Sequence, residues 1–283
     1  MKINWFPGHM SKALRMMESN IKLVDVVGYV LDARAPKSCF NPSFTKIFLG
    51  KPCLFILNKC DLADASKVAE WREYFKKRGE TSVSVTSINS SDSKKIVDAF
   101  ATLSAPLVDK YKAKGVCKTV RAMIVGVPNC GKSTIINCLS GKKATITGDK
   151  PGVTKGKQWV RLTDGLDLLD TPGTVWSNFT DQLVAQHLAF IGSIKDDIID
   201  IIEVSQLLLE ELITLYPKEL IARYNIDIEV NNGAELLTQI SKNRGFLLRG
   251  GEFDYERGAK AVIDDFRKGK IGRITFETPN RNV

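Results

Sequence analysis

Residues 119–139, TVRAMIVGVPNCGKSTIINCL, decide the fold class of this chain. Their first half is an apolar run that is typical of a buried strand, and their second half has the pattern of a helix. The segment 126–134, GVPNCGKST, lies between the two and matches G-x-x-x-x-G-K-[S/T]. Glycines there let successive main-chain N–H groups approach a phosphate chain, next to a helix N-terminus that favours negative charge. The stretch therefore predicts a phosphate-binding loop.

Each polar residue type in this loop has a chemical reason to be there. Lys132 would bridge the β- and γ-phosphates during catalysis, and the Ser133 hydroxyl would ligate Mg²⁺. The residues expected to line the nucleotide are Asn129, Cys130, Gly131, Lys132, Ser133 and Thr134.

Two further segments fit the metal and the γ-phosphate. Asp170, in the sequence Asp170-Thr-Pro-Gly173, follows an apolar strand and fits the carboxylate that holds Mg²⁺, while the Gly173 N–H would bond the γ-phosphate. Thr154, in Pro151-Gly-Val-Thr154, fits the hydroxyl that completes the Mg²⁺ shell when the γ-phosphate is present. The alternative for both segments is a plain turn.

The base would be recognised by Asn58-Lys-Cys-Asp61, at another strand end. The Asp61 carboxylate can accept from N1–H and N2–H₂ of guanine, a donor pair that adenine lacks. Asn58 would bond the base or brace the phosphate loop, and the Lys59 stem would cover the base face. Ser87 and Ile88 fit a small-residue loop with a main-chain N–H on guanine O6, although alanine is the usual companion of the serine.

Short apolar runs alternate with helical patterns up to residue 177. Strands are expected at 24–33, 53–59, 82–87 and 119–127, with a hairpin of 158–162 and 165–170, and helices at 64–79 and at 92–112, interrupted near Pro106. Runs that are apolar throughout are typical of parallel strands covered on both faces. After 178 a 3.6-residue pattern dominates, before a short terminal strand at 273–277. We expect an α/β, doubly wound, mostly parallel sheet in 1–177 and a smaller, mostly α-helical domain in 178–283.

Composition narrows the function classes. The chain has 283 residues and a net charge of +9, and residues 1–177 hold 28 basic and 15 acidic side chains. Such a surplus is typical of a protein with a polyanionic partner, usually nucleic acid, and equally of a generic basic protein with solvated lysines. The apolar runs are too short for a membrane span, and the first residues lack the pattern of a secretory signal. We expect a cytoplasmic monomer without membrane or DNA binding.

The motif order and the opening Trp5-Phe-Pro-Gly-His9-Met10 carry a resemblance. The base motif precedes the phosphate loop, so the usual motif cycle is intact but begins at a different point. With Asp32-Ala-Arg34-Ala-Pro36, the chain resembles the circularly permuted GTPases, and most closely the ribosome biogenesis GTPase A (RbgA, or YlqF) family. The resemblance implies a permuted P-loop GTPase domain and a GTP switch, alternating between GTP and GDP, that assists late assembly of the bacterial large (50S) ribosomal subunit.

The resemblance also implies partners: the large-subunit precursor and its rRNA, which stimulates hydrolysis. Plausible phosphate contacts are Lys12, Arg15, Lys242, Arg244, Arg249, Lys268, Lys270 and Arg273. The rival hypothesis is a regulatory module that binds GTP, barely hydrolyses it and acts on a protein partner. A metabolic kinase is a third, but we find no motif for its general base.

Two roles remain open between a catalytic and a structural interpretation. Thr174 and Val175 follow Gly173, so the glutamine that orients the attacking water in Ras-like GTPases is missing. The resemblance nominates His9 for that role, and the alternative is a turn histidine used for RNA contact. Asn129 fits an asparagine that coordinates K⁺ in potassium-activated GTPases, and the alternative is an asparagine that satisfies the turn.

Overall fold

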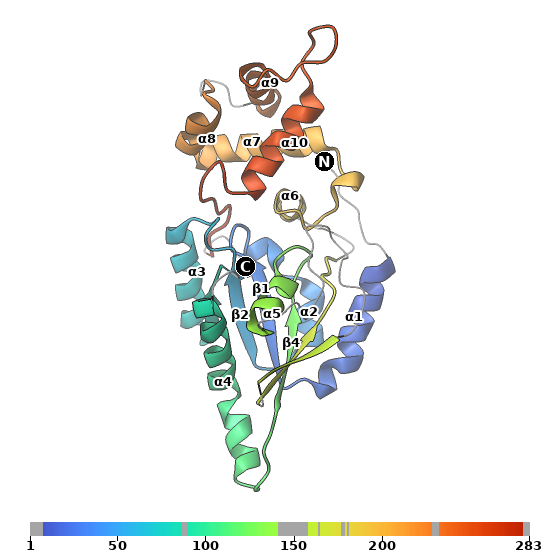
Figure 1. Ribbon diagram of the computed structural model, residues 1–283, viewed down its shortest axis with the longest axis vertical. Helices are drawn as coiled ribbons and strands as arrows, with labels where there is room; N and C mark the ends of the chain where they lie inside the picture. The colour runs from blue at the N-terminus through green and yellow to red at the C-terminus, as the bar shows by residue number, and fades with distance from the viewer. Residues whose placement is uncertain are drawn as a thin grey trace.

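The computed structural model describes residues 8–86, 90–140, 158–163, 165–176, 179, 181–227 and 232–279. Within these residues a six-stranded sheet has the order β3-β2-β1-β4-β6-β5 (Figure 1). The strands are β1 (Val26–Asp32), β2 (Cys53–Asn58), β3 (Thr81–Ser84), β4 (Val120–Val125), β5 (Gln158–Thr163) and β6 (Leu166–Asp170). All neighbours pair in parallel except β5 and β6, which form the expected hairpin. The predicted α/β, mostly parallel sheet is confirmed.

Helices cover both faces of this sheet, and the central strand β1 is buried along its whole length. On β1, Gly28 faces α4 (Ser90–Lys112), where an added Cβ would lie 2.8 Å from Phe100 Cζ. Tyr29 faces the other way and packs edge-on against Phe44 of α2 (Pro42–Ile47). On that second face α3 (Ala65–Lys77) stacks Phe75 on Phe55 of β2, and α1 (Gly8–Asn20) contacts α2. The helix after the phosphate loop, α5 (Lys132–Ser140), lies beside α4.

One helix differs from its expectation. The sequence predicts an interruption near Pro106, but α4 runs continuously through this proline. A proline removes one main-chain N–H and leaves the carbonyl four residues earlier, here that of Thr102, without its helical partner. Thr102 and Pro106 are both exposed, so water can satisfy that carbonyl. The helix therefore continues.

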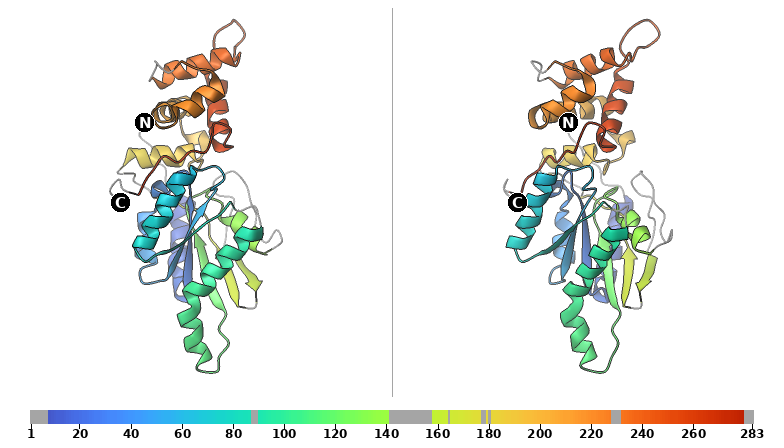
Figure 2. Two further views of the ribbon diagram at one scale, coloured as in Figure 1. Left: turned by 90° about the vertical axis from the view of Figure 1, so that its left-hand side faces the viewer. Right: turned by 60° about the vertical axis from the view of Figure 1, so that its left-hand side comes forward.

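The second half of the chain is helical, as the 3.6-residue pattern predicts. It comprises α6 (Gln182–Phe190), α7 (Ile201–Leu215), α8 (Pro217–Tyr224), α9 (Gly233–Asn243) and α10 (Tyr255–Arg267). Asp200 caps α7, Asn232 caps α9 and Asp254 caps α10, each accepting from a first-turn N–H. α7 packs against α8, α9 and α10, and this group lies beyond one end of the sheet with α6 between (Figures 1 and 2). No helix among the described residues has the length and apolar character that crossing a bilayer requires.

The C-terminal segment returns to the sheet after α10. Its residues 273–277 are extended, but they form no strand of the sheet, so the predicted terminal strand is wrong. Instead they cross the carboxyl ends of β1 and β2: the Ile274 N–H donates to Leu62 O at 3.0 Å and the Phe276 N–H to Arg34 O at 2.8 Å. These main-chain groups find partners in loops because the neighbouring strand edges are already paired.

Candidate nucleotide-binding site

The carboxyl ends of the parallel strands bring the sequence motifs to one edge of the sheet. The loop after β4 has positive φ at Gly126 (152°), Asn129 (57°) and Gly131 (99°). At Gly126 a Cβ would lie 2.5 Å from Val30 O, so glycine is required there for close packing. These turns curl the main chain into a concave loop that leads into the N-terminus of α5, a shape suited to phosphate oxygens.

Lys132 and Gly173 meet at this loop. The Lys132 side chain is buried, and its Nζ donates to Val127 O at 2.8 Å and to Gly126 O at 3.2 Å. A Cβ on Gly173 would lie 2.6 Å from Pro128 Cα and 2.8 Å from Lys132 Nζ. The segment that begins at Asp170 therefore touches the loop and its lysine, as the motifs predict.

Ser133 and Asp170 form a pair of oxygen donors. Ser133 Oγ donates to Asp170 Oδ2 at 3.0 Å, and Asp170 is fully buried. No described residue donates to Asp170 Oδ1. Burial raises the pKa of this carboxyl despite the opposing effects of Lys132 and Ser133. A buried, unpartnered carboxylate oxygen beside a hydroxyl fits the hard oxygen ligands that Mg²⁺ prefers.

The base motif contacts the phosphate loop directly. Asn58 Nδ2 donates to Cys130 O at 2.8 Å, and Lys59 Nζ donates to Asn129 O at 2.6 Å. Of the two roles considered for Asn58, this geometry favours bracing the loop. Lys59 has a positive φ of 59°, which turns its side chain back across the strand ends. Asp61 lies two residues further along with an exposed side chain.

The structure shows no contact of one expected residue with these groups and does not describe the side chains of four others. Thr134 is exposed on α5. Ser87, Ile88 and Thr154 lie outside the described residues, and of His9 only the main chain is described, in the first turn of α1.

The helical half contacts the phosphate loop, which no sequence pattern indicated. After α6, Ser193 Oγ donates to Pro128 O at 2.7 Å, and Asn129 Nδ2 donates to Gly192 O at 2.7 Å. Gly192 needs its positive φ of 78° to present this carbonyl. The residues in each of these contacts lie more than sixty positions apart, so no local sequence pattern could reveal them. The loop that would hold the phosphates is thus braced from outside the sheet.

Two further polar residues near this edge have structural partners. His187 on α6 is buried, with its ring nitrogens 2.8 Å from Glu277 and 2.9 Å from Glu211. Arg34 is also buried and pairs with Asp32 at 2.7 Å, so its guanidinium is not exposed for RNA contact. Asp32 belongs to the same motif as Arg34, but the sequence predicts no role for its carboxylate.

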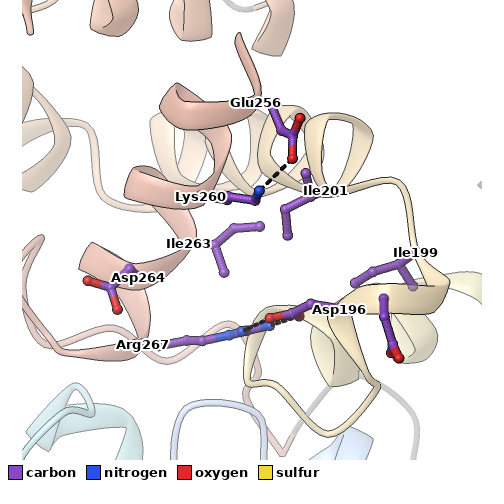
Figure 3. A pocket seen from close by; sticks show the side chains of 9 residues that line it. Asp196, Ile199, Ile201, Glu256, Lys260, Ile263, Asp264 and Arg267 are labelled. Carbon is purple, nitrogen blue, oxygen red and sulfur yellow. Dashed lines mark hydrogen bonds and ion pairs between the residues drawn. The ribbon is translucent and has the colours of Figure 1, made fainter. Parts of the chain in front are cut away.

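A pocket of about 550 Å³ lies away from the sheet edge, between α10 and the start of α7 (Figure 3). It is lined by Asp196, Asp197, Ile199, Ile201, Glu256, Lys260, Ile263, Asp264 and Arg267. Four of these side chains are acidic and two are basic, so the pocket disfavours an anionic phosphate chain. Arg267 crosses it and pairs with Asp196 (η3, Asp196–Ile198) at 2.7 Å. The charges of this pocket therefore fit a nucleotide less well than those of the sheet edge do.

Comparisons with known proteins agree with the geometry. Residues 121–230 match the family described as 50S ribosome-binding GTPase, and residues 7–103 match one described as ethanolamine utilisation - propanediol utilisation. The ribosome biogenesis GTPase A of Bacillus cereus is 43% identical over 99% of this chain and 95% of its own, and that of Priestia megaterium is 42% identical over 99% and 98%. The crystal structure of GNP-bound YlqF from Thermotoga maritima superimposes with a TM-score of 0.67, at 29% identity over 95% of this chain and 99% of that one.

Proposed function

The chain belongs to the ribosome biogenesis GTPase A family and is a GTPase of ribosome assembly, and from this premise we propose that it is a Mg²⁺-dependent switch that binds the rRNA of the large-subunit precursor. GTP is hydrolysed by direct attack of water on the γ-phosphate, which releases GDP and phosphate. The protein then leaves the particle.

One observation supports this proposal above the others. Motifs from residues 58–59, 129–133 and 170–173 converge at one sheet edge, although their order along the chain is permuted. The contacts of Asn58 and Lys59 with the main chain of the phosphate loop, at 2.8 and 2.6 Å, join the base side to the phosphate side. A guanine nucleotide laid along this edge meets both sets of groups at once.

The chain's own residues supply the metal shell and the phosphate contacts. Ser133 and Asp170 would hold Mg²⁺, and Thr154 would join them when the γ-phosphate is present. When bound, the ion neutralises charge on the β- and γ-phosphate oxygens. Lys132, which donates to two loop carbonyls in the structure, turns its Nζ to the phosphates instead.

Water activation requires a group other than the glutamine of Ras-like proteins, because Thr174 stands in its place. Thr174 is buried, and its oxygens lie 3.4 Å from Asn41 Nδ2, so it does not face solvent. We assign the orientation of the water to a neutral His9 imidazole, brought to the γ-phosphate when the ribosome docks. K⁺ bound at the side-chain oxygen of Asn129 would supply positive charge to the transition state.

The second part of the proposal concerns the helical half, residues 178–283. We place the domain boundary after 177 and assign rRNA binding to the helical domain of a cytoplasmic monomer. Gly173 reports the γ-phosphate, and the chain runs from it directly into α6. A shift of this segment on hydrolysis therefore acts on the helical domain.

The experiment that tests the proposal measures GTP hydrolysis in KCl, with and without large ribosomal subunits, for the wild type and His9→Ala. We expect strong stimulation of the wild type by the particle, and loss of stimulation in the variant with particle binding retained. Intact GTP binding without stimulation would instead support the regulatory-module hypothesis. A matched series in NaCl tests the K⁺ assignment, since Na⁺ should fail to support the full rate.

A further inference from the structure

Lys59 is anchored at two points. Its Nζ lies 2.6 Å from Asn129 O of the phosphate loop and 3.0 Å from Asp32 Oδ2. Asp32 is the last residue of β1 and pairs in register with Asn58, so the parallel strands place the carboxylate and the lysine side by side. The ammonium is therefore fixed between a carboxylate and the loop that surrounds the phosphates.

The Asp32 carboxylate is itself held rigidly. Arg34 donates Nε to Oδ1 at 2.9 Å and Nη2 to Oδ2 at 2.7 Å, and its main-chain N–H donates to Oδ1 at 3.1 Å. Burial acts to raise the pKa of Asp32, but Arg34 and Lys59 outweigh burial and hold the pKa well below its usual range. The Asp32 carboxylate is thus ionised, and its negative charge pairs with the two cations Arg34 and Lys59. A bidentate guanidinium fixes the carboxylate plane as well as its charge.

Arg34 connects this carboxylate to the helical half. Its Nη1 donates to the main-chain carbonyl of Arg267 at 3.3 Å, and its guanidinium lies over the Phe266 ring, 5.1 Å from the centroid. The Arg267 side chain in turn bonds the Ala189 and Phe190 carbonyls of α6, next to the pocket of Figure 3. The position of α10 therefore determines where the carboxylate is held.

We propose that Asp32 is a positioning residue for guanine nucleotide binding. Its carboxylate holds the Lys59 ammonium in place, so that the aliphatic part of Lys59 lies along the base and the ammonium stabilises the phosphate loop. Arg34 keeps the carboxylate in place and makes that position depend on the docking of α10. The inference rests on the guanine site proposed above. It assigns Asp32 an effect on nucleotide affinity rather than on the hydrolytic step, because Asp32 acts through Lys59, a residue of the base motif.

The test compares the full-length wild type with Asp32→Asn and a control variant, Asp25→Asn. Asp25 also forms an ion pair, with Lys118 Nζ at 2.8 Å, but it precedes β1 at the opposite edge of the sheet. The probe is GDP carrying a fluorescent label, and the melting temperature is followed in parallel. We expect Asp32→Asn to weaken GDP binding by about tenfold or more, with kcat at saturating GTP within about twofold of the wild type. Asp25→Asn should bind GDP like the wild type.

A double-mutant cycle separates positioning from a general structural effect. If Asp32 acts through Lys59, Asp32→Asn should cost little further affinity in a Lys59→Met background, which keeps the stem but not the ammonium. Full additivity, or an equal loss in Asp25→Asn, would overturn the inference, as would wild-type affinity in Asp32→Asn. Failure of the wild type to bind GDP would instead overturn the proposed site itself.

If Asp32→Asn does not fold, a second comparison tests whether the ion pair between Asp32 and Lys59 supports nucleotide binding. Lys59 is partly exposed, so its variants are expected to fold. Lys59→Arg keeps a cation within reach of Asp32 and should retain most of the GDP affinity, whereas Lys59→Met should lose about tenfold. Equal affinities of these two variants would show that the ion pair positions nothing.

Discussion

At the scale of single residues, base selectivity depends on Asp61. Its exposed carboxylate can accept both hydrogen bonds that guanine offers through N1 and N2. Asp61→Asn replaces one acceptor with a donor, so we expect GDP affinity to fall by roughly a hundredfold and the preference over ADP to disappear. Competition titrations with GDP and ADP measure both quantities. A variant that still prefers GDP would show that another group selects the base.

Gly173 tests the contact between the Asp170 segment and the phosphate loop. A Cβ there would lie 2.6 Å from Pro128 Cα and 2.7 Å from Pro128 N, main-chain atoms that cannot move aside cheaply. Gly173→Ala should therefore displace the segment, and we expect GTP hydrolysis to fall at least roughly tenfold in a folded protein. The control is Gly165→Ala in the β5–β6 turn, where nothing lies within 4 Å of an added Cβ. Equal rates for both variants would show that the close approach of Gly173 to the loop does not matter for hydrolysis.

The sequence predicts residue roles well where the chemistry is local. Ser133 and the loop glycines belong to one short motif, and the contacts of Asn58 and Lys59 with the loop follow from the parallel strands. The role of Asp32 was missed because its partners are a residue two positions ahead and a lysine that directly follows the neighbouring strand. Such a pair gives no periodic signal, and it becomes visible only when the register of β1 and β2 is known.

At the scale of elements, the C-terminal segment joins the two strand-end loops. Thr275 is fully buried; its Oγ1 donates to Ala33 O at 2.9 Å and accepts the Asp64 N–H at 3.1 Å. Thr275→Val keeps the shape but leaves the N–H and the carbonyl unpaired, so we expect a loss of about 1–3 kcal/mol in unfolding free energy. Urea unfolding measures it. Thr214→Val, at an exposed position of α7, should lose under about 0.5 kcal/mol; equal losses would contradict the bracing role.

The docking of α6 is expected to depend on pH through His187. Burial acts to lower the pKa of His187, but the hydrogen bonds to Glu211 and Glu277 outweigh burial and raise the pKa to about 9. Because the folded-state pKa exceeds the unfolded value, the protonated His187 contributes to the unfolding free energy. This contribution is complete below about pH 6.5 and disappears as the pH rises through about 9. It amounts to at most roughly 3 kcal/mol.

His187→Gln tests this dependence, since glutamine carries no charge at any of these pH values. Unfolding free energies at pH 6, 7.5 and 9 should decline steadily for the wild type and stay nearly flat for the variant. A parallel decline in both proteins would show that other groups cause it.

Helices and strands could be predicted from the sequence where their apolar residues form a continuous run or a regular repeat. Buried runs located β1, β2 and β4, and the 3.6-residue repeat located α7 and α10. The expectation failed for 273–277, whose alternating residues suit a strand, because their partners are loops and not a strand edge. It also failed at Pro106, where an exposed helix face tolerates the missing hydrogen bond.

At the scale of the whole molecule, the phosphate loop is contacted from both halves of the chain. Asn58 and Lys59 reach it from the sheet, and Ser193 reaches it from the helical half. The sequence predicts a sheet half and a helical half, but their contacts join residues that are far apart along the chain, so local patterns cannot reveal them. Nucleotide state and helical-domain position are therefore expected to influence each other.

RNA binding by the helical domain is expected to depend on cations that no acidic side chain neutralises. Arg249 is exposed in the turn before Phe253 and has no ion pair within the described part of the chain, whereas Lys260 pairs with Glu256 on α10.

Each cation that neutralises an RNA phosphate releases a counterion, so removing one such cation lowers the slope of log Kobs against log salt by about 0.7 to 0.9. Arg249→Gln should thus reduce the slope measured with ribosomal RNA by about 0.7 to 0.9, and Lys260→Gln should leave it unchanged because that ammonium is already paired. Filter binding over a range of KCl concentrations gives both slopes. Equal slopes for wild type and Arg249→Gln would remove this turn from the RNA interface, and a larger reduction in Lys260→Gln would place the interface at Lys260 on α10 instead.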